Sequence, residues 1–175
     1  MRKTRLYLLF SFLFLLIPTI SFGYIGLIEE INPNIPHKRA VALNDHIIDL
    51  SNQYRIPVDL IVAMIWQESH FRNMRSQVRT RQGQEVSCGY IQIQPETFEL
   101  EAGYPLVGET KEKQCQSMIY SWKTTLRVAV KHLNTLRDQY GLLNAIGSYN
   151  SGPRYGSKNI EYASKVLSKY REIKR

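Results

Sequence analysis

The 175-residue chain is 43% hydrophobic, which is enough for one domain with an apolar core and too short for two large domains. Its formal net charge is +8, and the basic residues are dispersed along the chain. This dispersal argues against a nucleic-acid-binding protein and favours an anionic partner such as an acidic membrane face or a cell wall bearing carboxylated peptides.

The first 23 residues have the anatomy of a secretory signal peptide. Cations at positions 2, 3 and 5 precede an apolar run over residues 6–17, which Pro18 breaks, and residues 21–23 (SFG) place small side chains where a signal peptidase reads. An uncleaved anchor is the alternative, but the run is shorter than the roughly 20 residues of a spanning helix. We expect an exported, periplasmic protein cleaved after Gly23, with a net charge of +5 once those three cations are removed.

Export also decides how the two cysteines are interpreted. In an oxidising compartment Cys88 and Cys115 are favoured to form a disulfide, with two separate buried thiols as the alternative. Two cysteines and four scattered histidines have no metal-ligand spacing. We therefore predict no metal site and no cofactor.

Residues 24–37, with Pro33 and Pro36, are expected to form an extended lead-in to a domain over residues 38–175. The first helix of that domain is marked by apolar side chains three and four positions apart: Ala40, Leu43, Ile47, Leu50 and Tyr54. Pro57 suits the start of a second helix. This helix is apolar nearly all round over residues 60–66 and is predicted to be central and buried.

The rest of the chain predicts more helices and one small sheet. Residues 72–87 are polar and fit a loop or a β-hairpin, and Pro95 opens a short helix. A long helix follows from Trp122 to Gly141, and a short one begins at Leu142 and ends at Gly147 or at residues 150–153. The last helix is expected to bury one side formed by Ile160, Ala163, Leu167 and Tyr170.

The buried helix ends in a single carboxylate. In AMIWQESHFRN, residues 63–73, Glu68 follows a run of apolar side chains. Burial disfavours the charged form and raises the pKa of a carboxyl group, and an acid still protonated near neutral pH can donate to a leaving oxygen. Glu68 is therefore a candidate general acid. A carboxylate that caps the turn or pairs with Arg72 or Arg75 is the alternative.

Two further segments carry polar side chains among small residues. Residues 89–97 (GYIQIQPET) place Gln92 in a glycine-led run that turns into a helix. Residues 145–153 (AIGSYNSGP) deliver Tyr149 and Asn150 into a tight turn. Small residues allow close approach of a backbone or ligand, and amide and hydroxyl groups can bind a sugar.

Together with residues 68–71 (ESHF), these segments resemble, in order and rough spacing, the three signature blocks of lytic transglycosylases with a goose-lysozyme-like SLT domain. The resemblance covers residues 47–166. It implies a mainly α (α+β, lysozyme-like) fold, a single helical domain with a small β-hairpin beside the active-site cleft. It also implies cleavage of the MurNAc-β-1,4-GlcNAc bond in peptidoglycan glycan strands, which we expect a monomer to perform.

The resemblance further implies a mechanism with one acid, because no second acid lies inside the three blocks; Glu85 falls on the polar loop. Glu68 would protonate the departing GlcNAc while the N-acetyl group of MurNAc assists. It would then take the proton of the MurNAc 6-hydroxyl, which attacks C1 and gives a 1,6-anhydro ring.

By the same resemblance, the substrate-binding residues are Gln92, Ile91, Tyr149, Asn150, Tyr162 and Ser76. Ile91 stands where relatives carry methionine, and Ser76 is one position out of the family register. Core positions are the alternative for Tyr149 and Tyr162, a polar amide on a strand is the alternative for Gln92, and a turn-forming role is the alternative for Asn150.

Residues 68–89 form a longer segment than in cell-wall recycling members of that family. In this they resemble small single-domain versions that accompany secretion or conjugation machines, and the resemblance implies such a complex as a partner. Two rival functions stay open from the sequence. One is a hydrolytic lysozyme (muramidase) acting on the same bond, and the other is a non-catalytic wall-binding module.

Overall fold

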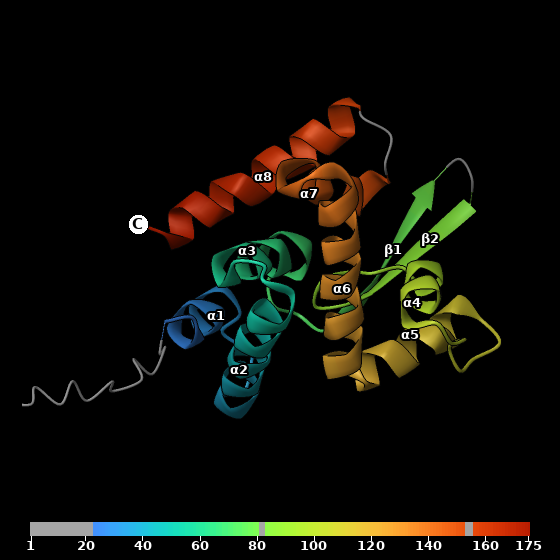
Figure 1. The fold of residues 1–175 in the computed structure, drawn as a ribbon. Coiled ribbons are helices and arrows are strands. Elements are labelled where there is room, and N and C mark those ends of the chain that lie inside the picture. Colours follow the sequence, from blue (N-terminus) through green and yellow to red (C-terminus); the bar gives the residue numbers. More distant parts are fainter. Residues whose placement is uncertain (1–22, 81–82, 153–155) are drawn as a thin grey trace, which may run out of the picture.

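The computed structural model describes residues 23–80, 83–152 and 156–175, and the predicted signal peptide lies almost entirely outside this range (Figure 1). Within it the chain forms eight helices and one two-stranded sheet. They are α1 (Ile25–Ile31), α2 (His37–Tyr54), α3 (Val58–Ser69), β1 (Met74–Thr80), β2 (Gly83–Gly89), α4 (Pro95–Ala102), α5 (Lys111–Tyr120), α6 (Trp122–Tyr140), α7 (Leu142–Ser151) and α8 (Ser157–Ile173). The predicted fold class is confirmed.

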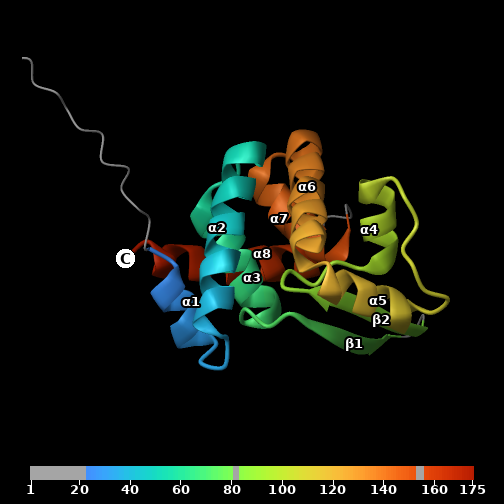
Figure 2. The same ribbon diagram turned by 90° about the horizontal axis from the view of Figure 1, so that it is seen from below.

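Helix α3 is the buried centre of the domain, as its all-round apolar character predicts. Its residues 60–65 are at most 2% exposed, and it packs against α2 and α8. In both ribbon views α6 separates α1, α2 and α3 from α4, α5 and the sheet (Figures 1 and 2). The end of α3 therefore lies inside the domain, where the two halves meet.

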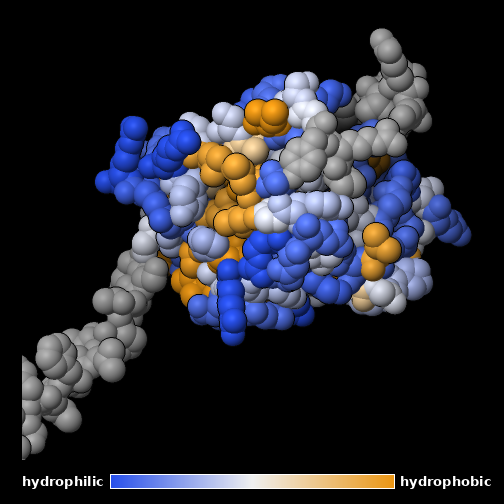
Figure 3. All heavy atoms as spheres, turned by 45° about the horizontal axis from the view of Figure 1, so that its top comes forward, coloured by the Kyte–Doolittle hydropathy of each residue, from blue (hydrophilic) through white to orange (hydrophobic). Residues whose placement is uncertain are grey.

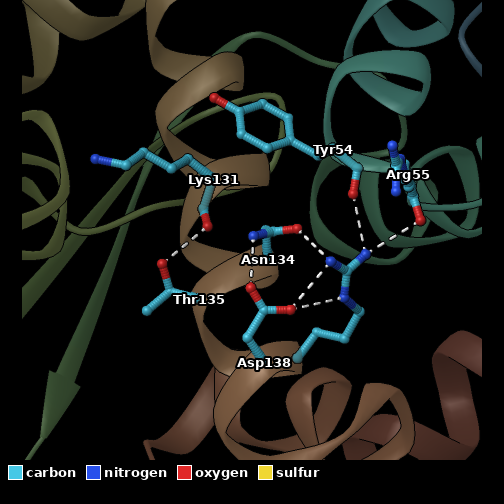
Figure 4. A network of polar contacts seen from close by, with 7 residues as sticks. Tyr54, Arg55, Lys131, Asn134, Thr135 and Asp138 are labelled. Atoms are coloured by element: carbon cyan, nitrogen blue, oxygen red, sulfur yellow. Dashed lines mark hydrogen bonds and ion pairs between the residues drawn. The ribbon is translucent and has the colours of Figure 1, made fainter.

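Helix α2 buries the predicted stripe, and its C-terminus is capped by a side chain from α6. Arg55 ends the helix in a left-handed conformation with φ 52°. Arg137 Nη1 donates to the carbonyls of Tyr54, at 2.9 Å, and Arg55, at 3.1 Å, while Nη2 donates to Asn134 Oδ1 at 2.7 Å (Figure 4). A cation at a helix C-terminus satisfies its last carbonyls and complements its dipole.

Replacing Arg137 with methionine should lower the free energy of unfolding by about 1–2 kcal/mol, because one partly buried carbonyl and one exposed carbonyl lose charge-assisted hydrogen bonds. Urea unfolding measures the change, and Arg171→Met on the exposed surface of α8 is the matched control. Equal stability of the two variants would contradict the capping role.

The β-hairpin prediction is confirmed, and a disulfide holds the sheet to a helix. Strands β1 and β2 pair antiparallel with Met74 opposite Gly89 and Thr80 opposite Gly83. Cys88 on β2 is bonded to Cys115 on α5, with Cα atoms 5.5 Å apart. The disulfide and the packing of α5 on β2 and α6 thus hold the hairpin to the domain.

Three details differ from the sequence expectations. The lead-in is not extended: residues Ile25–Ile31 form α1, because Ile28 is fully buried and Pro33 and Pro36 come only after the helix ends. Helix α5 is additional. The buried face of α8 is formed by Asn159, Tyr162, Ala163 and Val166, whereas Ile160 is 70% exposed. Within the described ranges, no helix has both the length and the apolar character needed to cross a membrane.

Candidate active site

A polar cleft of about 590 Å³ opens where the end of α3 meets the sheet, α4, α6 and α7. Its lining is Glu68, Ser76, Glu85, Ser87, Gln92, Ile93, Gln94, Thr97, His132, Ser148, Tyr149, Asn150, Ser151 and Gly152. Among the described residues, no group of three or more His, Cys, Asp or Glu side chains could hold a metal ion. The lining residues offer hydroxyl, amide and carboxyl groups to a ligand.

Glu68 is positioned by the way α3 ends. The next turn reverses the chain through His70 and Phe71, both with positive φ, and Phe71 is fully buried. Ser69 Oγ donates to the carbonyl of Tyr90 at 2.6 Å, which ties the helix end to the segment after β2. Glu68 thus points into the cleft from a rigid helix terminus.

The carboxyl group of Glu68 is kept largely dry, and burial raises its pKa to about 7, although a hydrogen bond from Tyr162 opposes the shift. Tyr162 Oη donates to Glu68 Oε1. Burial and the nearby Glu68 raise the pKa values of the Tyr149 and Tyr162 phenols well above that of an ordinary tyrosine. Both phenols therefore remain neutral hydrogen-bond donors. At neutral pH Glu68 is close to half protonated, which suits a general acid.

Close packing of α7 on α8 brings these tyrosines to Glu68. A Cβ on Gly147 would lie 2.9 Å from the carbonyl oxygen of Asn159, so a side chain there would push the helices apart. Asn159 Nδ2 also donates to the carbonyl of Gly152 at 3.0 Å. The small residues of the third block therefore set the distance between helices as well as giving access to the cleft.

Gln92 and Ser76 meet in the cleft. Ser76 Oγ donates to Gln92 Oε1, and Gln92 Nε2 donates to the carbonyls of Gly89, at 2.7 Å, and Met74, at 3.0 Å. The amide thus holds the start of β1 against the turn after β2, with φ 52° at Gln92 itself. Both hydrogens of Nε2 are used in these contacts, and Oε1 accepts one hydrogen bond. Gln92 can therefore accept one further hydrogen bond from a ligand at Oε1.

The other predicted site residues are placed differently. Tyr149 lines the cleft and donates to the carbonyl of Ile91 at 3.1 Å, and exposed Asn150 lines it from the last turn of α7. Ile91 does not line the cleft, because its side chain is fully buried in the core. Tyr162 is also buried, so it contacts Glu68 and not a ligand in the cleft.

Among the cleft residues that were not predicted from the sequence, two carry ionisable side chains, Glu85 and His132. Glu85 lies on β2 and not on a loop, so strand pairing brings this exposed carboxylate to the cleft. His132 comes from the middle of α6 and contacts Glu101 of α4. If the polar residues 72–87 are taken as a hairpin, Glu85 becomes a candidate for the cleft wall. No local sequence pattern marks His132.

Comparison with known proteins is consistent with this arrangement. The family model of the transglycosylase SLT domain matches residues 45–171. The chain belongs to this family. No curated protein matches the chain. A solved structure with the same fold is that of an inactive glutamate-to-glutamine mutant of lytic transglycosylase Slt from Pseudomonas aeruginosa, with a TM-score of 0.54 and 18% identity. The match covers 74% of this chain and 23% of that one, so this SLT domain spans a small part of the relative.

Replacing Tyr162 with phenylalanine should move the alkaline loss of activity to higher pH by about one unit. The hydroxyl stabilises the Glu68 carboxylate, so its removal leaves burial unopposed and raises the pKa further. A pH–rate profile of kcat/KM measures the shift, with exposed Tyr120→Phe as the control. An unchanged or lower midpoint would show that the hydroxyl does not act on the Glu68 proton.

Proposed function

We propose that this SLT domain is a peptidoglycan lytic transglycosylase that cleaves the MurNAc-β-1,4-GlcNAc bond and forms 1,6-anhydroMurNAc. The observation that carries the proposal is one buried acid, with a pKa of about 7, in a cleft whose other lining residues are mainly neutral and polar. The family match supports it. So does the relative Slt, a lytic transglycosylase whose glutamate-to-glutamine mutant is inactive.

In the proposed reaction Glu68 gives its proton to the glycosidic oxygen as the bond to C1 of MurNAc breaks, and GlcNAc leaves as an alcohol. The N-acetyl oxygen of MurNAc stabilises the positive charge that develops at C1. The Glu68 carboxylate then removes the proton of the MurNAc 6-hydroxyl, whose oxygen bonds to C1. The proton count on Glu68 is restored, and no water is consumed.

The product distinguishes this reaction from hydrolysis. Purified protein spanning residues 24–175 should release, from isolated sacculi, fragments whose MurNAc ends are lighter by one water than reducing ends. In water labelled with heavy oxygen these ends should carry no label. Reducing, labelled ends would overturn the transglycosylase assignment and leave a muramidase. Failure to release any fragments would leave a wall-binding module.

Hydrolysis on the same bond is the second candidate, because Glu85 places another carboxylate on the cleft wall. The common glycosidase route uses two carboxyl groups. In the single-acid mechanism Glu85→Gln should keep kcat within about twofold of the wild-type value, since the substrate itself supplies the nucleophile. A loss of about a hundredfold or more would indicate that Glu85 activates water.

We also propose that the chain is exported to the periplasm and acts as a monomer that opens the wall locally for a secretion or conjugation complex. The signal-like residues 1–23 and the longer segment 68–89, which contains the hairpin, support this proposal. Mass analysis of the protein recovered from a periplasmic fraction tests the export. A mature N-terminus at Tyr24 is expected, and an intact Met1 would contradict cleavage.

A further inference from the structure

A second buried carboxylate lies behind the wall of the cleft. Glu101 of α4 is 10% exposed at its side chain and accepts hydrogen bonds from two side chains of α6. His132 Nδ1 lies 3.0 Å from Glu101 Oε1, and Thr135 Oγ1 lies 3.5 Å from Oε2. Lys131 Nζ donates to the carbonyl of Glu101 at 2.5 Å and lies 3.9 Å from Oε2. The single-acid mechanism does not use any of these groups.

The carboxylate determines the orientation of the His132 ring. An ionised carboxylate only accepts hydrogen bonds, so Nδ1 must carry the proton in this pair. Nε2 of the neutral ring is then an acceptor. In the part of the chain that the structure describes, no group forms a hydrogen bond with Nε2, although His132 lines the cleft. A ligand in the cleft is therefore the natural partner of Nε2.

The surroundings of His132 indicate the chemistry of that partner. Its ring centroid lies 5.7 Å from that of Tyr149, whose hydroxyl is engaged by the carbonyl of Ile91. Next to them are the neutral polar residues Ser148, Asn150 and Ser151. A wall of hydroxyl, amide and ring surfaces suits a sugar, whose hydroxyl and N-acetyl N–H groups can donate to an aromatic nitrogen.

We propose that His132 is a glycan-binding residue whose Nε2 accepts a hydrogen bond from a sugar hydroxyl or N-acetyl N–H, and that Glu101 is its positioning residue. This inference rests on the proposed function and adds a contact on the α6 wall. That wall and the hairpin residues Ser76 and Glu85 line the same cleft. Glu101 acts by holding the ring in one tautomer, as a carboxylate does for the histidine ligands of metal sites.

The test measures glycan binding apart from cleavage. In a Glu68→Gln background, calorimetry with a soluble peptidoglycan glycan fragment gives Kd for the His132→Asn and His132→Gln variants. Asparagine keeps a nitrogen near the Nδ1 position and loses the Nε2 acceptor, whereas glutamine keeps a polar atom near Nε2. His132→Asn should weaken binding about fivefold to tenfold, as expected for one lost hydrogen bond, and His132→Gln should weaken it less.

The control is His37→Asn, because His37 is exposed at the start of α2 and lies outside the cleft lining. It should bind as tightly as the background protein. Unchanged Kd in His132→Asn, equal weakening in both His132 variants, or no glycan binding with His132 intact would overturn the inference. If Kd depends on His132 while the wild-type protein forms no anhydro ends, the inference stands and the proposed function fails.

Discussion

Replacing Glu68 with glutamine should reduce the release of fragments from sacculi by at least about a thousandfold. Glutamine has nearly the same shape and can still accept the hydrogen bond from Tyr162, so the cleft should keep its geometry. It cannot transfer a proton to the leaving oxygen or take one from the 6-hydroxyl. Both steps of the proposed reaction therefore lose their only protein acid and base.

Glu96→Gln is the matched control for this variant, because Glu96 is exposed on α4 and pairs with Lys111 on the surface. It should cleave sacculi at the wild-type rate. Near-identical circular dichroism spectra would establish that both variants fold. Substantial cleavage by folded Glu68→Gln protein would place the catalytic acid elsewhere, and Glu85 would be the first residue to examine.

The second large effect concerns stability, and it follows from the raised pKa of Glu68. In the unfolded chain this carboxyl group has an ordinary pKa near 4.5, against about 7 in the folded protein. Between these values the folded state keeps a proton that the unfolded state has lost, so the free energy of unfolding falls as pH rises. The full loss is about 3 kcal/mol, and it is reached above the folded pKa.

Glu68→Gln removes this titration, and the phenols of Tyr149 and Tyr162, whose pKa values lie well above 10, do not ionise in the same pH range. The variant should therefore gain about 3 kcal/mol relative to the wild-type protein as pH rises from about 4 to about 8. Urea unfolding at both pH values gives the difference between the two proteins. A difference that does not change with pH would mean that Glu68 titrates alike in the folded and unfolded states, and hence that burial does not hold its proton.

A loss of folding stability of this kind is common where a fold holds a catalytic group. A carboxyl group at the end of an apolar helix is less favourable for folding than a neutral side chain of the same size, and active sites often keep groups that reduce stability. Here the cost is confined to pH values at which Glu68 must ionise. The dry environment that destabilises its anion is also what preserves the acid form for catalysis.

The sequence predicted those features that depend on local pattern. The apolar stripe of α2 and the buried run of α3 follow from residue spacing, whereas the polar residues 72–87 left a loop and a β-hairpin open. The extended lead-in was a wrong prediction because two prolines dominate a short segment, whereas burial of Ile28 against the core decides its helical structure. The buried face of α8 was misplaced for a related reason: Tyr162 turns towards Glu68, and only the folded chain reveals that partner.

The site residues also divide into those that local sequence predicts and those that only the folded chain reveals. Glu68, Gln92 and Tyr149 sit in sequence blocks with recognisable residue types, and the fold brings all three to one cleft. Ile91 was assigned to the cleft because its block neighbours are there, but in the folded chain its side chain is fully buried in the core. The contact between Glu101 and His132 joins two helices that are far apart in the sequence, so local spacing carries no sign of it.

The account depends on Glu68 holding its proton near neutral pH, and carboxyl carbon NMR of the folded protein measures this directly. A titration of carbon-labelled glutamate, with the Glu68 signal identified by its absence in Glu68→Gln, should give a midpoint of about 7. Tyr162→Phe should raise that midpoint. A Glu68 midpoint near the ordinary glutamate value would mean that the group is ionised and solvated at neutral pH, and this would contradict its role as the catalytic acid.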